Sequence, residues 1–262
     1  MSSPVLREQG RLPVDRLRIH QAIVDQLRLT PGDTLLDVGC GNGLTLATAA
    51  SRCPELSVIG IDVDEEAVAA AESWLGETDA CCRWFCGDLA APLPLPDDSV
   101  TRVVCHDVLE CVEDAGRVLD EAARVMRPGS VSVWSHVDYE AILVGGGDRM
   151  LTRRMVNAYA DASYLKVGNS DAQAARKLAA MIDRSTLSRV GIDTGSMIAT
   201  DLAGPGRRRI DDIARTVIRS ADSGGTDVHP DEVAEWTASL ERAEERGEFF
   251  YSQTAYIVTA AS

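Results

Sequence analysis

The feature that most constrains the fold is an apolar segment, Thr34–Val38, that runs into glycines at alternate positions. Gly39, Gly41 and Gly43 follow the segment, and helix-forming residues follow the glycines. Each glycine lacks a Cβ, so the backbone can turn sharply and a ligand can lie directly against it. The pattern predicts a buried strand, a tight turn and a helix whose first amides present the positive end of the helix dipole to a ligand.

The spacing of the glycines argues against two common phosphate-binding loops. The dinucleotide fingerprint G-x-G-x-x-G would need a third glycine where Leu44 or Leu46 stands. The phosphate-loop signature needs a lysine after its last glycine, and no lysine follows here. The chain instead has the pattern D-x-G-x-G-x-G, which begins at Asp37.

This pattern resembles motif I of the class I S-adenosylmethionine-dependent methyltransferases, of the small-molecule, UbiE-like type. Four later segments resemble the same family, in the order in which the family has them. They are Ser57–Asp62 with Val63, Cys81–Cys86 with Gly87-Asp88-Leu89, Val100–Cys105 with His106–Glu110, and Pro128-Gly129 with Ser130–Trp134. The five segments together extend over residues 34–137.

The resemblance implies that S-adenosylmethionine is the cofactor and that it lies at the ends of successive strands. Motif I would hold its methionine part, Asp62 its ribose hydroxyls and Asp88 its adenine amino group, with Val63 packed on the adenine ring. An acidic residue about 20 positions beyond the glycines binds ribose in other βαβ units as well. The predicted cofactor-binding residues are Asp37, Gly39, Cys40, Gly41, Asn42, Gly43, Asp62, Val63, Asp88, Leu89 and His106. The alternatives are that Val63 and Leu89 are core residues and that His106 is an ordinary loop residue.

The catalytic residues are expected after the fifth strand. Methyl transfer from a sulfonium is an in-line displacement that depends on alignment and on exclusion of water, and a base is needed only for a protonated acceptor. We predict His136, Asp138 and Tyr139 as the catalytic group, with His136 as base because its ordinary pKa lies near neutral pH. Two structural alternatives stay open, since His136 can be a packed core residue and Asp138 can cap the next helix. No metal ligand is predicted, because Asp107 and Asp138 are too few carboxylates for a metal-assisted transfer.

The resemblance also implies the fold and its divisions. We expect an α/β fold with a Rossmann-like, doubly wound, mostly parallel sheet of seven strands and a helical cap inserted around strands five to seven. The expected segments are an N-terminal helical lid (1–30), a cofactor-binding core (31–138), a helical cap segment (139–193), a core strand (194–206), a helical cap insertion (207–247) and a final core strand (248–262). In the lid, Arg16 or His20 would contact the methionine carboxylate or the acceptor, or else lie on a solvated helix face.

Composition restricts the partners. The net charge of −15 disfavours nucleic acid and a membrane surface, both of which attract basic proteins. The seven cysteines contain no C-x-x-C pair, so reduced thiols are expected, with zinc as the lesser alternative. Without a visible signal peptide or an apolar run of about 20 residues, a cytoplasmic location is expected.

The expected function is transfer of a methyl group to a small organic acceptor by a monomer or homodimer. Nitrogen is slightly preferred over oxygen or carbon as the methylated atom, because the predicted pocket rim is acidic. The Ala-, Arg-, Asp- and Gly-rich composition is typical of bacteria that make secondary metabolites, which are the expected acceptors. Two alternatives use the same scaffold: a cofactor-binding enzyme that catalyses cyclisation or isomerisation, and a cofactor-binding regulatory protein.

Overall fold

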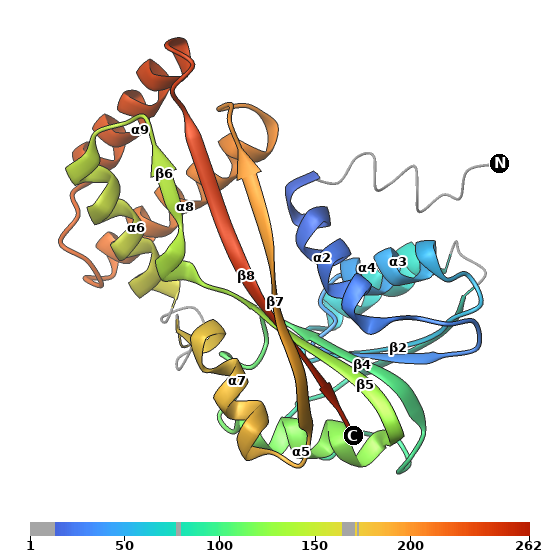
Figure 1. Cartoon of the computed structure of the whole chain (residues 1–262). Helices are drawn as coiled ribbons and strands as arrows, with labels where there is room; N and C mark the ends of the chain where they lie inside the picture. Colours follow the sequence, from blue (N-terminus) through green and yellow to red (C-terminus); the bar gives the residue numbers. More distant parts are fainter. Residues whose placement is uncertain (1–13, 77–79, 164–170, 172) are drawn as a thin grey trace. The chain divides into compact units, whose positions relative to one another are not determined.

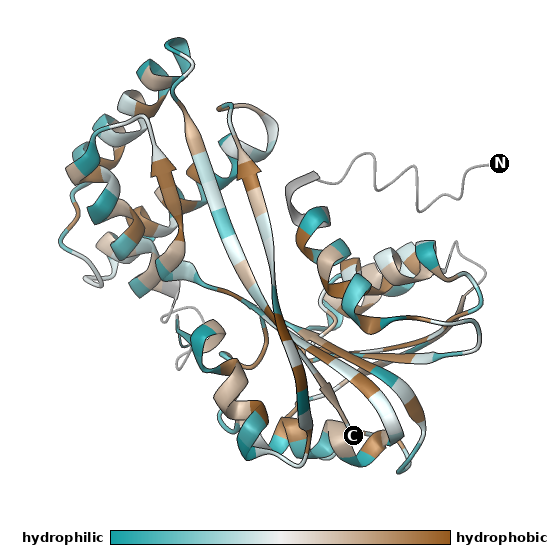
Figure 2. Cartoon of the chain, viewed as in Figure 1, coloured by the Kyte–Doolittle hydropathy of each residue, from teal (hydrophilic) through white to brown (hydrophobic). Residues whose placement is uncertain are grey.

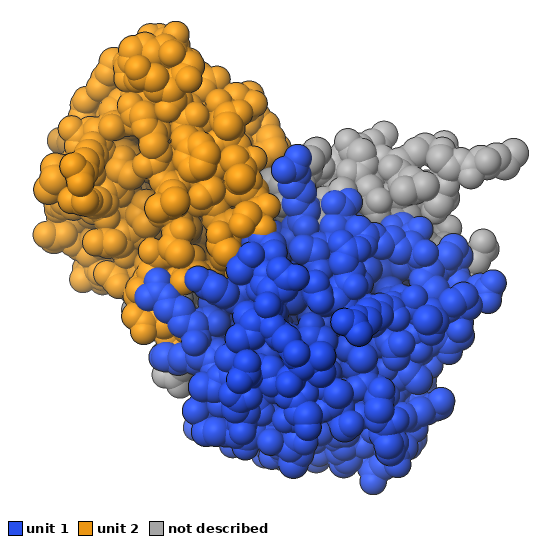
Figure 3. Space-filling model, viewed as in Figure 1, with its two compact units in different colours: residues 1–136, 174–195, 255–262 blue, residues 137–173, 196–254 orange. Residues whose placement is uncertain are grey.

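The structure, a computed structural model, describes residues 14–76, 80–163, 171 and 173–262. Its chain forms two compact units, coloured separately in Figure 3. Unit 1 consists of residues 1–136, 174–195 and 255–262, and unit 2 of residues 137–173 and 196–254. The boundary differs from the expected cap segment 139–193, because the part of it from residue 174 onward belongs to unit 1.

Unit 1 is built on a mostly parallel sheet (Figure 1). Its strand order is β3-β2-β1-β4-β5-β8, and β7 pairs with β8. β1 pairs in parallel with β2 on one side and β4 on the other, so the strand order reverses beside β1. The strands are β1 (Thr34–Val38), β2 (Ser57–Asp62), β3 (Cys81–Cys86), β4 (Val100–His106), β5 (Met126–Val137), β7 (Ser188–Ala199) and β8 (Phe250–Ala261), of which β5, β7 and β8 continue into unit 2. The predicted α/β, mostly parallel architecture is confirmed.

Two helices of unit 1, α4 and α5, begin at side chains that cap their N-termini. Asp64 accepts hydrogen bonds from the amides of Glu66 and Ala67, and Asp114 accepts one from the amide of Arg117, as short polar side chains do at a helix start. The helices are α2 (Val14–Leu27), α3 (Leu44–Arg52), α4 (Glu65–Leu75), α5 (Ala115–Val125) and α7 (Ala174–Arg184). None of the described helices of the chain is long and apolar enough to cross a membrane.

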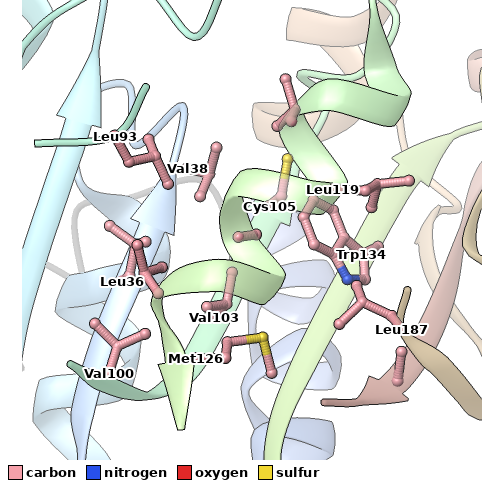
Figure 4. Close-up of a cluster of buried hydrophobic side chains, with 14 of the residues drawn as sticks. Leu36, Val38, Leu93, Val100, Val103, Cys105, Leu119, Met126, Trp134 and Leu187 are labelled. Carbon is pink, nitrogen blue, oxygen red and sulfur yellow. The ribbon is translucent and has the colours of Figure 1, made fainter. Parts of the chain in front are cut away.

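The core of unit 1 lies between the sheet and α5 (Figure 4). Apolar residues are concentrated along the strands, as the hydropathy colouring of Figure 2 shows. Trp134 is fully buried on β5, where its indole N–H donates to the hydroxyl oxygen of Ser132 at 2.9 Å. One apolar stripe of α5 is buried in this cluster. Its residues are Val118, Leu119, Ala122 and Val125.

The described residues of unit 2 form three α-helices, a short edge strand, parts of β7 and β8 and the last residue of β5. Its own elements are the 3-10 turn η1 (Tyr139–Ala141), β6 (Leu143–Gly145), α6 (Arg149–Ser163), α8 (Gly204–Asp222) and α9 (Pro230–Glu245). β6 pairs antiparallel with β8, and the sequence did not predict it because three residues are too few for a periodic pattern.

Two expected boundaries were wrong. The strand expected at 194–206 is β7, which begins at Ser188 and ends at Ala199. Its first half was missed because seven of its first eight positions are not buried, so the sequence shows no apolar alternation there. Gly204, which lies in the expected strand segment 194–206, instead opens α8, and Pro205 occupies the first turn, where its missing N–H has no helical partner to lose.

The packing of α5 predicts that a substitution on this helix lowers the free energy of unfolding far more than one at an exposed position of β7. Leu119→Ala should lower the free energy of unfolding by about 2–5 kcal/mol, because it removes a fully buried side chain from a packed cluster. Val190→Ala, at a position 58% exposed on β7, should change it by less than about 0.5 kcal/mol. Urea unfolding of both variants measures the difference, and equal effects would show that the cluster is not the core of unit 1.

Candidate functional site

The turn after β1 is fixed by hydrogen bonds to the end of β2. The amides of Gly39 and Cys40 donate to the carbonyl oxygen of Ile61 at 2.8 and 2.9 Å. The amide of Gly43 closes the turn by donating to the carbonyl oxygen of Cys40 at 2.9 Å. The turn therefore has one defined backbone shape without a bound ligand.

The three predicted glycines have different reasons to be glycine. All three have positive φ angles, of 77°, 48° and 79° at Gly39, Gly41 and Gly43. A Cβ on Gly39 would lie 2.2 Å from a methyl carbon of Val108, and one on Gly43 would lie 2.9 Å from the Cβ of Ala71. A Cβ on Gly41 would meet nothing within 4 Å. Gly39 and Gly43 therefore allow close packing within the protein, whereas Gly41 leaves its face open to a ligand.

Helix α3 begins at this turn with its first amides uncapped by any side chain. Its N-cap is Gly43, and its first turn contains no acidic residue. The free amides and the helix dipole therefore favour a negatively charged group, such as a carboxylate, at this end. Asn42 is exposed beside the turn, while Cys40 is buried, and burial raises the pKa of its thiol well above the ordinary range. Cys40 is therefore a neutral packing residue rather than a nucleophile.

Asp37 is a buried carboxyl group beside a second one. Its side chain is completely enclosed, and burial, with a further contribution from the charge of Asp62, raises its pKa to about 8. Its Oδ2 atom has no hydrogen-bond partner among the described residues. A buried polar atom without a partner is costly, so this oxygen is suited to accept a hydrogen bond from a bound cationic group.

Asp62 is held at the end of β2 by backbone amides. Its Oδ2 accepts from the amide of Gly41 at 2.7 Å and its Oδ1 from the amide of Asp64 at 3.0 Å. Each carboxylate oxygen has a second lone pair, so both oxygens can still accept from a ribose hydroxyl. Asp62 therefore also joins the glycine turn to the end of β2.

The predicted adenine residues lie at the next strand ends. Val63 is 71% exposed, which is unusual for an apolar residue beside a polar loop, whereas Leu89 is buried. Asp88 is exposed, and its Oδ1 accepts from the amide of Ala90 at 2.8 Å. Both Asp88 and Leu89 line a cavity of about 640 Å³ whose opposite side is formed by residues 111–114 and the start of α5. This cavity is of the size that ligand-binding pockets have.

A chain of ionisable side chains lies at the ends of β4 and β5. Nε2 of the fully buried His136 is 2.5 Å from a carboxylate oxygen of Glu110, and its Nδ1 is 3.5 Å from Oδ1 of Asp107. Oδ2 of Asp107 lies 3.3 Å from Nε2 of His106, whose Nδ1 is 3.2 Å from the hydroxyl of Ser135. Asp107 has a positive φ of 55°, a strained conformation for a residue other than glycine.

Sequence reasoning singled out His106 and His136 and considered Asp107, but it gave no role to Glu110 and did not predict that the two carboxylates lie beside His136. Glu110 and Asp107 follow β4 in a segment already matched to the family, and that segment was the available signal. The end of β4 is parallel to that of β5, with His106 opposite Ser135, so both loops meet at one edge of the sheet. His136 is therefore neither a solvent-facing base nor a core residue in apolar surroundings.

Helix α2 contributes a third histidine to this edge. His20 Nδ1 lies 2.9 Å from the hydroxyl of Thr45 in α3, and its ring meets that of His106 edge-on with centroids 5.0 Å apart. Of the two alternatives for His20, the structure supports a position beside the glycine turn over a solvated helix face. The side chain of Arg16 lies outside the described residues.

Asp138 and Tyr139, the other two predicted catalytic residues, belong to unit 2. Asp138 is buried, and its carboxylate accepts from the amide of Glu140, so it caps η1 as the structural alternative expected. Tyr139 is half-buried and meets the ring of Tyr159 edge-on, with centroids 6.1 Å apart. These two residues are therefore assigned to a different unit from His136.

Comparison with known proteins identifies the segment that forms this edge. Residues 36–133 match the family model described as "Methyltransferase domain". The chain is 34% identical over 127 residues to the 27-O-demethylrifamycin SV methyltransferase of Amycolatopsis mediterranei. The matched region covers 47% of this chain and 45% of that protein. It is 34% identical over 113 residues to the demethylmenaquinone methyltransferase of Symbiobacterium thermophilum, over 42% of this chain and 45% of that protein.

The fold as a whole is similar to that of solved proteins. The crystal structure of the [4+2]-cyclase SpnF matches with a TM-score of 0.59 and 20% identity, covering 99% of this chain and 92% of that one. The chain spans less than half the length of the curated relatives it matches. The family match over residues 36–133 includes the glycine turn, β2, β3, β4 and part of β5.

The raised pKa of Asp37 predicts how stability depends on pH. The unfolded carboxyl ionises near 3.8 and the folded one near 8, so the folded state holds the proton more tightly. The stabilisation is fully present below pH 3.8 and is lost progressively as the pH rises to about 8. Asp37→Asn, which cannot ionise, should therefore gain stability relative to the unchanged protein as the pH rises from 5 to 8, and the difference should then level off.

Melting temperatures of both proteins across pH 5–9 in one mixed buffer measure this difference. Asp64→Asn, which keeps a helix-capping side chain at an exposed site, is the control and should give a difference that does not vary with pH over that range. A pH-independent difference for Asp37→Asn would show that Asp37 is ionised in the folded protein.

Proposed function

We propose that this chain, whose residues 36–133 match the family model described as "Methyltransferase domain", transfers a methyl group from S-adenosylmethionine to a small organic acceptor. The observation that carries the proposal is the arrangement of Asp37, the glycine turn and Asp62 at the switch point beside β1. In open α/β sheets, ligands bind at the carboxyl ends of the strands where the strand order reverses. The cofactor-binding residues of unit 1 all lie at that edge.

The residues at this edge fit each part of the cofactor. Oδ2 of Asp37 is a buried acceptor suited to the methionine ammonium, and the free amides of α3 suit its carboxylate. Gly41 leaves open the face on which the methionine part would lie. Asp62 suits the ribose hydroxyls, and the exposed Val63 suits one face of the adenine.

When bound, S-adenosylmethionine would supply an electrophilic methyl group to a nucleophilic atom of the acceptor, with S-adenosylhomocysteine as the leaving group and product. The protein's own contribution is to bind, orient and exclude water. The backbone hydrogen bonds of the glycine turn and of Asp62 fix these positions before binding, which lowers the cost of ordering.

For an acceptor that carries a proton, we assign the proton acceptor to Asp107 and His136 acting together. His136 is fully buried, so Asp107, whose side chain is 27% exposed, is the end of the pair that an acceptor can touch. A carboxylate oxygen of Glu110 lies 2.5 Å from the other imidazole nitrogen, and we assign Glu110 as a positioning residue. Asp138 and Tyr139 remain predicted catalytic residues, and their assignment depends on the acceptor.

The acceptor is proposed from charge and from the relatives. Asp107 and Glu110 make the edge acidic, which favours an amine nitrogen over oxygen or carbon as the methylated atom. The similarity to a rifamycin methyltransferase supports a secondary metabolite as acceptor. The other relative cited above is named a demethylmenaquinone methyltransferase. The identification of the methylated atom therefore includes oxygen and carbon acceptors.

A second candidate is a reaction on the same cofactor-binding scaffold without net methyl transfer. The matching structure of a [4+2]-cyclase supports this candidate, because that protein has the same fold. A regulatory protein that binds the cofactor without chemistry is the third. Consumption of the cofactor separates methyl transfer from both.

The ribose assignment predicts a specific loss of binding. Asp62→Ala should weaken binding of S-adenosylmethionine about 10- to 100-fold, because it removes the charged acceptor of two hydroxyl hydrogen bonds. Glu66→Gln, which removes an exposed charge from the first turn of α4, is the control and should bind almost normally. Calorimetric titration measures both, and unchanged affinity in Asp62→Ala would overturn the assignment.

The proton-acceptor assignment predicts a loss of rate with binding retained. With methyl-labelled S-adenosylmethionine and a metabolite extract, mass spectrometry should find a labelled product and so identify the acceptor and the methylated atom. On that acceptor, Asp107→Asn and His136→Gln should each lower kcat about 10²-fold or more and leave the affinity for S-adenosylmethionine within about threefold.

The pH profile separates a proton-transfer role from a structural one. Glu110→Gln keeps a hydrogen-bond acceptor beside His136 and should shift the pH at which kcat is half-maximal rather than abolish the reaction. If the three variants lost rate with an unaltered pH profile, the residues would be structural. If no component of the extract caused S-adenosylmethionine to be consumed, a non-methylating scaffold would be favoured.

A further inference from the structure

Unit 2 contains a cavity that the proposed methyl transfer does not use. It has a volume of about 420 Å³, within the range of small-molecule pockets, and it is formed by η1, β6, the glycine loop that follows and α6. One wall is apolar and includes Ile142, Leu143 and Val156. The lining also includes Arg149 and Arg153, both exposed.

The positions of the two arginine side chains on α6 are electrostatically unfavourable. They are four residues apart and therefore lie on one face of α6, where like charges repel. They also lie near the N-terminus of α6, whose dipole disfavours a positive charge, and the first turn of α6 contains no acidic residue. Neither arginine forms an ion pair with any described residue, although the chain carries 41 acidic residues.

The lining also contains a carboxylate, but it forms no ion pair with either arginine. Glu140 also lines the cavity, but its two oxygens accept from the side-chain amide of Gln173 at 3.1 and 3.2 Å. Elsewhere in unit 2, Arg207 forms an ion pair with Glu241, and Arg242 with Glu235. The two guanidinium groups of the cavity differ from these in forming no ion pair with a described residue, so they remain available to a bound anion.

The glycine loop holds the cavity in shape. A Cβ on Gly146 would lie 2.5 Å from the carbonyl oxygen of Glu248, and one on Gly147 would lie 2.7 Å from a methyl carbon of Leu240. The loop is thus packed against the end of α9, which is the close backbone approach that three consecutive glycines allow. Asp148 follows it and caps α6 by accepting from the amides of Met150 and Leu151.

We propose that this cavity of unit 2 binds an organic anion, with its carboxylate or phosphate group on Arg149 and Arg153 and its apolar part against Ile142, Leu143 and Val156. Guanidinium groups suit both anions because their planar N–H groups match paired oxygens. An anion would relieve the repulsion between the two arginines and their conflict with the helix dipole together. The proposal does not depend on methyl transfer, because every lining residue belongs to unit 2.

Calorimetric titration of the full chain with simple amphiphiles tests the proposal. The probes are octyl phosphate and octanoate, each below the concentration at which it forms micelles, which distinguish a phosphate ligand from a carboxylate ligand. We expect at least one to bind, and Arg149→Gln/Arg153→Gln to weaken that binding about tenfold or more. Arg242→Gln, an equal loss of charge on α9, should leave the affinity unchanged. Leu143→Ser should weaken binding of the octyl probe while leaving the fold intact, because Leu143 is 60% exposed.

Three results would overturn the proposal. The first is that neither octyl probe binds. The second is that octyltrimethylammonium, which has the same tail and the opposite charge, binds as tightly as octyl phosphate, which would mean non-specific adsorption of the tail. The third is that Arg242→Gln weakens binding as much as the double variant, which would mean attraction by overall charge. All three readouts concern binding to unit 2, so they are independent of whether S-adenosylmethionine binds or reacts.

Discussion

The site of unit 1 depends on one unfavourable arrangement, a buried carboxyl group beside a second carboxylate. Asp37 at the end of β1 is enclosed, and Asp62 at the end of the neighbouring β2 raises its pKa further. Asp62 cannot move away, because backbone amides of the glycine turn and of α4 hold both of its oxygens. Such an arrangement costs stability in the folded protein, and a bound cation offsets that cost. A stability cost concentrated at one point is typical of a binding site.

The parallel sheet is what makes this arrangement possible. β1 has parallel neighbours on both sides, so the loops after β1, β2 and β4 all leave the same edge. The next parallel pair, β4 and β5, adds His106, Asp107 and His136 to that edge. Residues separated by a hundred positions in the chain thus meet because strand direction, rather than sequence distance, determines where they lie.

The sequence predicted the parts of the fold and site that local patterns encode. The α/β class was expected from the resemblance of five segments to a known family, and the structure has it. The caps Asp64 and Asp114 and the apolar stripe of α5 correspond to short capping and periodic patterns in the sequence. β6 and the first half of β7 were not predicted, because a three-residue strand and an exposed edge strand lack an apolar alternation. The partners of His136 were not predicted either, since Glu110 and Asp107 reach it through the pairing of β4 with β5, which no local pattern specifies.

The central claim is that Asp37 is protonated near neutral pH until a cationic ligand binds beside it. Calorimetric titration with S-adenosylmethionine at pH 7, in two buffers of different ionisation enthalpy, counts the protons released on binding. The unchanged protein should release more protons than Asp37→Asn, because the bound cation lowers the pKa of Asp37 and the amide has no proton to lose. Equal proton release by the two proteins, with S-adenosylmethionine bound to both, would contradict the account.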